Sequence, residues 1–76
     1  PNPFTNTITI EFELKNPEKM NITIYNHLGE KVETIEEDPV YRNHQVNLDA
    51  GDLPAGVYFC VIRANREIQT MKMIKL

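Results

Sequence analysis

Few residues in this 76-residue chain have side chains suited to catalysis, and they are scattered along it. Cys60 lies within an apolar run, where we expect a buried and unreactive thiol, because a nucleophile needs a base beside it. His27 and His44 have no second histidine or cysteine at a spacing that would hold a metal ion. We therefore predict that the chain is not an enzyme and uses no metal or cofactor, since no nucleophile, base and orienting group can be assembled.

Two groups of carboxylates could still bind cations. The first is the run Glu-Glu-Asp-Pro at residues 36–39, which we interpret as an acidic, solvated turn. In the second, Asp49 and Asp52 lie in a glycine-containing segment whose oxygen ligands could bind Ca²⁺ weakly. We favour the interpretation in which an aspartate there caps backbone N–H groups of a turn.

The elements that must position these side chains are β-strands, because apolar residues recur at every second position. Val32 and Ile35 break this alternation, which predicts a bulge or an early strand end between them. Val57–Ala64 is apolar at both parities, which predicts a central strand covered on both sides. We expect strands at residues 8–14, 20–25, 31–36, 44–48, 57–64 and 67–76. The pattern predicts an all-β, immunoglobulin-like antiparallel β-sandwich of six to seven short strands.

The composition of the chain excludes some classes of function. The net charge is −3, and the local excess of basic residues after position 50 is too small for nucleic-acid binding, so no nucleic-acid partner is expected. No apolar run approaches the ~20 residues of a membrane span. One cysteine allows no internal disulfide. The prolines of Pro1-Asn2-Pro3 stiffen the chain, and we interpret residues 1–5 as the end of an interdomain linker and 6–76 as one domain.

Four motifs occur in order along the chain. The segment Pro1–Phe4 precedes a Thr-Ile-Thr-Ile strand, Ile24–Val32 reads IYNHLGEKV, Asp49 precedes LPAGVY at Leu53–Tyr58, and Lys72-Met73 stands near the end. Together they resemble the C-terminal sorting domain of the type IX (Por) secretion system, type A, found in Bacteroidetes-type bacteria. The resemblance covers the whole chain.

The resemblance implies a non-catalytic signal attached to an upstream cargo domain. Such a cargo passes through the periplasm, and the signal then directs it across the outer membrane to the cell surface or the medium. The implied partners are an outer-membrane shuttle protein and a sortase-like peptidase. By the same resemblance Gly29, Gly56 and the final strand with Lys72 and Lys75 are the recognition elements.

Two modes of action remain open from the residues themselves. The final strand could present its edge or a basic patch to a receptor by strand addition, and the same edge would allow dimerisation. Alternatively, the chain is an immunoglobulin- or fibronectin-like accessory module, which acts as a spacer or binds carbohydrate through Tyr25, Tyr41 or Tyr58. Sandwich architecture alone does not separate these functions.

Overall fold

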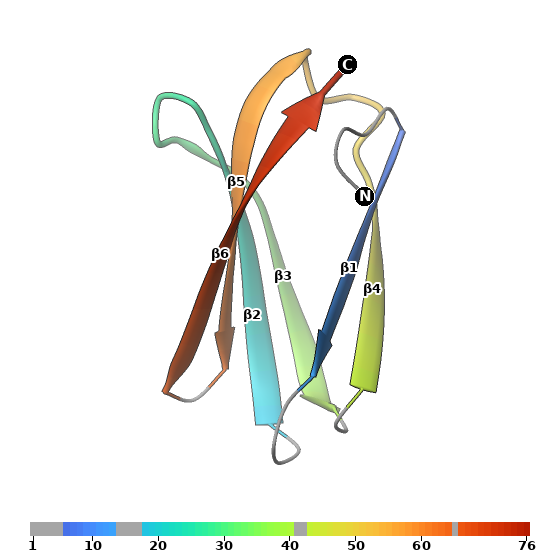
Figure 1. The fold of residues 1–76 in the computed structure, drawn as a ribbon, viewed down its shortest axis with the longest axis vertical. Coiled ribbons are helices and arrows are strands. Elements are labelled where there is room, and N and C mark those ends of the chain that lie inside the picture. Colours follow the sequence, from blue (N-terminus) through green and yellow to red (C-terminus); the bar gives the residue numbers. More distant parts are fainter. Residues whose placement is uncertain (1–5, 14–17, 41–42, 65) are drawn as a thin grey trace.

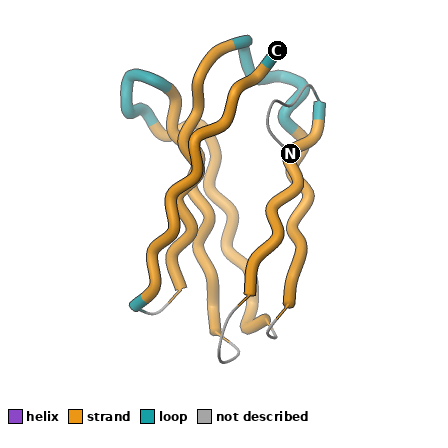
Figure 2. Tube along the Cα trace, in the orientation of Figure 1, coloured by secondary structure: helices purple, strands orange, loops and turns teal. Residues whose placement is uncertain are grey.

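The strands were located in a computed structural model that describes residues 6–13, 18–40, 43–64 and 66–76. These residues form six strands and no helix, which confirms the predicted all-β class (Figures 1 and 2). The strands are β1 Thr7–Glu13, β2 Glu18–Asn26, β3 Lys31–Val40, β4 Asn43–Asp49, β5 Gly56–Ala64 and β6 Glu67–Lys75. The linker predicted at residues 1–5 lies outside the described residues.

The strands form two antiparallel sheets that pack face to face. The larger sheet has the order β3-β2-β5-β6, and the smaller sheet pairs β1 with β4. In Figure 1 the smaller sheet lies on the right, beside the larger one. This arrangement is consistent with the predicted immunoglobulin-like sandwich.

The core lies between the two sheets and follows directly from the alternation of apolar residues. Ile8 and Ile10 on β1 are about 1% exposed, as is Ile24 on β2, while Ile22 is fully buried. Burying one such side chain stabilises the fold by about 1.5–3 kcal/mol. The other buried apolar residues are Met20, Val46, Leu48, Ala50, Tyr58, Cys60, Ile62, Ala64 and Met73.

The third strand contains the predicted bulge. Ile24 pairs with Glu33 and Tyr25 pairs with Lys31, so Val32 is the extra residue. The bulge reverses the parity of the strand, and Val32 and Ile35 therefore both pack against the core.

The turn predicted at residues 36–39 is wrong, because β3 continues to Val40. Met20 and Asn21 of β2 still find partners there, in Glu37 and Glu36. Pro39 lacks a backbone N–H, but β3 is the edge strand of its sheet, where a proline is tolerated.

The fifth strand is central in its sheet, as predicted, but it is not covered on both sides. Every second residue is buried, whereas Val57, Phe59, Val61 and Arg63 point away from the core and are half-buried or exposed. Six strands make only two layers, and no described residue forms a third layer over this face. The continuous apolarity of β5 therefore leaves apolar side chains on the outside.

Candidate functional site

The β2–β3 hairpin forms one part of the end of the sandwich where the sequence motifs meet. The Asn26 side-chain oxygen accepts hydrogen bonds from the backbone N–H of Leu28 (2.9 Å) and of Glu30 (3.0 Å). Gly29 has a φ of 82°, and its N–H donates to the Asn26 carbonyl at 3.0 Å. The Asn26 side chain thus fixes the conformation of the turn by bonding its backbone N–H groups. The hairpin consequently holds Leu28, 71% exposed, in a defined position at its tip.

The connection between β4 and β5 forms the second part. Asp49 accepts a hydrogen bond from the Gly51 N–H at 3.0 Å, which confirms the predicted capping role. The Tyr58 hydroxyl donates to the Pro54 carbonyl at 2.6 Å and so fixes the loop onto β5. Gly56 has a φ of 150°, a backbone conformation that other residues rarely adopt. Within the described residues, no group of three or more acidic, histidine or cysteine side chains is arranged to hold a metal ion.

The two lysines of the last strand lie on opposite faces of the sheet. Lys72 is exposed on the outer face, opposite Phe59 of β5. Lys75 pairs with Gly56, is only 8% exposed, and donates a hydrogen bond from Nζ to the Ala50 carbonyl at 3.0 Å. The lysines therefore do not form a joint basic patch, and the Lys75 ammonium is not presented at the surface.

Ala50 is a structural residue that the sequence did not reveal. Its N–H donates to the Asn6 carbonyl at 2.8 Å, and its carbonyl accepts from both the Leu53 N–H and Lys75 Nζ. These bonds join the start of β1, the loop and the end of β6. The sequence does not indicate this role, because the Ala50 backbone, and not its side chain, makes these hydrogen bonds.

The structure thus brings some of the predicted recognition residues to one end of the sandwich. The turn between β2 and β3, which contains Gly29, the start of β5 at Gly56 and the end of β6 lie at the same end of the sandwich, the upper end in Figure 1. The Asn26–Tyr58 pair, between β2 and β5, connects the two glycine-containing turns.

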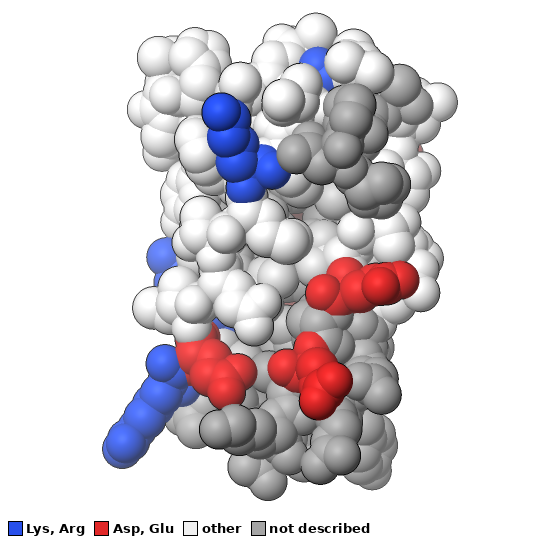
Figure 3. All heavy atoms as spheres, in the orientation of Figure 1, with Lys and Arg blue, Asp and Glu red and all other residues white. Residues whose placement is uncertain are grey.

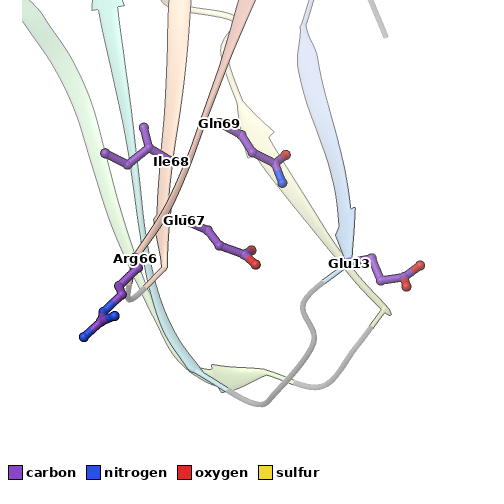
Figure 4. Close-up of a pocket in the computed structure, with 5 residues that line it drawn as sticks. All are labelled: Glu13, Arg66, Glu67, Ile68 and Gln69. Carbon is purple, nitrogen blue, oxygen red and sulfur yellow. The ribbon is translucent and has the colours of Figure 1, made fainter.

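A hollow lies at the opposite end, between the two sheets. It has a volume of about 560 Å³ and is lined by Glu13, Arg66, Glu67, Ile68 and Gln69. Glu67 and Gln69 point toward the side of β1, whereas Arg66 and Ile68 point away (Figure 4). Carboxylates gather in the lower half of the same face (Figure 3). The ionisable side chains of its lining are the carboxylates Glu13 and Glu67 and the guanidinium of Arg66.

Of the remaining candidate residues, Cys60 and Tyr58 are buried, Tyr25 is half-buried and His27 is exposed. The burial of Cys60 is as predicted, and desolvation raises the pKa of its thiol from 9.0 to about 11, which favours the protonated, unreactive form. His27 is exposed in the hairpin. Tyr58 is buried, so it cannot contribute to a sugar-binding platform. Tyr41 and the side chain of His44 lie outside the described residues.

The whole chain is similar to a known protein family. A family model described as a secretion system C-terminal sorting domain matches residues 1–76, the whole chain. A search of curated proteins found no match. The part of the chain that the structure describes contains no helix long and apolar enough to cross a membrane.

Proposed function

The chain belongs to the family of secretion system C-terminal sorting domains, and from this membership we propose that it is the signal that sends a particular cargo through the type IX system. Members of the family are C-terminal tails of cargo proteins and are recognised by the secretion system. Their role implies export across the outer membrane, to the cell surface or the medium. The match over the whole chain is the observation that carries this proposal.

The finer route follows the family. The cargo passes through the periplasm, an outer-membrane shuttle protein binds the folded domain, and a sortase-like peptidase then acts on the chain upstream of the sandwich. This order suits a domain that has no assembled catalytic set of its own among its described residues.

The geometry suggests which residues of the domain contact the receptor. The hairpin of Gly29, the turn of Gly56 and the exposed Lys72 lie at or near one end, supported by a defined network of hydrogen bonds. Lys75 contributes differently, because its buried ammonium holds the end of β6 on Ala50. We assign contact with the receptor to the first three and a positioning role to Lys75.

Strand addition at β6 is a second route of recognition that the geometry allows. β6 is an edge strand of the larger sheet, and Glu67–Thr70 are exposed on both faces. A partner strand can therefore approach this half of β6 with little rearrangement. The same edge would support dimerisation, which the chain's oligomeric state in solution would report.

The experiment is export of a reporter fused upstream of residues 1–76, in a host with a type IX system. The intact fusion should reach the surface or the medium, and a fusion lacking residues 67–76 should remain in the periplasm. Deletion of β6 also removes the strand that pairs with β5 at the buried residues Cys60 and Ile62, so it can destabilise the fold. The point variant Ile68→Glu, at a position of β6 that is 65% exposed, therefore serves as a second test. Retention of the intact fusion would disprove the sorting function and would make the spacer or sugar-binding module the next hypothesis.

A further inference from the structure

The outer face of the four-stranded sheet carries an apolar surface that no described residue covers. Val57 and Val61 of β5 are half-buried there, and Phe59 between them is 36% exposed. A solvated face of an antiparallel sheet is ordinarily polar, with the apolar residues confined to the other face. A stripe of three apolar residues at alternate positions therefore departs from what a solvated strand needs.

The neighbouring strands widen this stripe into a surface. Tyr25 of β2 pairs with Phe59 on one side, and Lys72 of β6 pairs with it on the other. Ile74, 40% exposed, lies opposite Val57. Contiguous apolar surface of this kind, crossed by polar groups, is typical of protein interaction sites. We call this surface, formed by Tyr25, Val57, Phe59, Val61, Lys72 and Ile74, the outer patch.

The charges around the outer patch indicate the partner. Lys31, Arg63 and Lys72 occupy register positions on this face and are exposed, and so is the carboxylate Glu36. Cations therefore outnumber carboxylates among the side chains that the structure describes here, although the whole chain has a net charge of −3. Charge of one sign on an apolar surface selects a complementary surface and steers the encounter with it.

The outer patch lies on the side of the four-stranded sheet away from β1, the strand with which the described chain begins. The described chain begins at Asn6 and enters β1, which belongs to the two-stranded sheet. The outer patch is on the far side of the other sheet, behind the core. The core therefore separates the outer patch from the point where the described chain enters β1.

We propose that the outer patch is the docking surface for a protein of the export machinery whose own surface is apolar and bears carboxylates opposite Lys72 and Arg63. The inference rests on the proposed function and names the chemistry of the partner. Lys72, one of the residues that the sequence singled out, lies within this patch, next to the end where the other motifs meet.

The test is export of the reporter fusion with variants of the outer patch. Val61→Thr keeps the shape of the side chain and removes only apolar character, and Phe59→Thr removes the centre of the patch. Lys72→Gln removes one positive charge. We expect a loss of export of about tenfold for Phe59→Thr, and a smaller loss for the other two, with melting temperatures close to that of the parent domain.

Asn47→Asp is the matched control, because it changes the net charge by −1 as Lys72→Gln does, but at an exposed position of the two-stranded sheet where the side-chain oxygen still accepts from Thr9 and Gln45. It should export normally. Normal export of folded Phe59→Thr and Val61→Thr would overturn the proposal, while the sorting function would still stand if the intact fusion is exported. An equal loss of export for Asn47→Asp would show that only the net charge of the domain matters, and this would overturn the assigned partner chemistry.

An anionic lipid surface is the competing occupant of a cationic, apolar face. Flotation of the 76-residue chain with vesicles of phosphatidylcholine and phosphatidylglycerol distinguishes it. We expect no vesicle binding at physiological salt. Vesicle binding that is lost in Phe59→Thr and Lys72→Gln would assign the outer patch to lipid and overturn the protein partner.

Discussion

Replacing Gly56 with alanine should destabilise the fold through its backbone alone. At the Gly56 φ of 150°, a Cβ would meet no heavy atom within 4 Å, so no neighbour has to move. The cost is the conformation itself, about 1–3 kcal/mol for a residue held in a region that glycine dominates. For a domain of this size each kcal/mol lowers the melting temperature by about 4–8 °C.

The other two glycines provide matched comparisons. Gly29 also has open space and a positive φ of 82°, so Gly29→Ala should cost about 1–2 kcal/mol and Gly29→Asn less, because asparagine tolerates this region. Gly51 is not a positive-φ glycine, and a Cβ there would lie 3.4 Å from the Asp49 carboxylate. Gly51→Ala should therefore cost the least.

The assay is urea unfolding of the four variants followed by far-ultraviolet circular dichroism. The expected order of stability is Gly51→Ala, Gly29→Asn, Gly29→Ala and Gly56→Ala, from highest to lowest. If Gly56→Ala unfolds at the same urea concentration as Gly51→Ala, the reasoning from backbone strain is wrong. Reporter export of variants that remain folded then separates the conformational role of Gly29 and Gly56 from a contact with the receptor.

Three further predictions concern the interior. Ile22→Ala should cost about 2–5 kcal/mol and leave little folded protein, whereas Ile68→Ala at an exposed position should change the free energy of unfolding by less than about 0.5 kcal/mol, both measured by urea unfolding. Lys75→Glu should lower the free energy of unfolding by about 3–5 kcal/mol, because it puts a carboxylate against the Ala50 carbonyl. Lys75→Met should lower it much less, and equal melting temperatures of the two variants would contradict this reasoning. Because the pKa of Cys60 is about 11 when folded and 9.0 ordinarily, the folded state keeps a proton that the unfolded state releases. Relative to Cys60→Ala, the free energy of unfolding should be constant below pH 9 and fall by about 1.4 kcal/mol per pH unit between pH 9 and 11; a flat difference would contradict it.

The alternation of residues predicted the fold well because its physical cause is local. Ile22 and Ile24 face the core because successive strand side chains point to opposite faces. The bulge at Val32 was predictable for the same reason, since two apolar residues of unlike parity can share a face only if one residue is inserted.

Where the predictions failed, the deciding contacts were distant in sequence. The acidic run at residues 36–39 looks like a turn, but pairing with β2 extends it into a strand. The apolarity of β5 suggested that both faces of its sheet are covered. The strand order shows that the described strands form only two layers, so one face has no covering layer. Lys75 resembled a surface residue, yet its environment depends on a carbonyl 25 residues earlier in the chain.

The hydrogen bonds at Ala50 have a mechanical consequence. Asn6 at one end of the described chain and Lys75 near the other are bonded to the same residue. Tension applied to the upstream end of the chain can therefore pass from Asn6 through Ala50 to β6 without crossing the core. In a domain pulled from its upstream end, these few hydrogen bonds would carry part of the load, together with the ladder between β1 and β4.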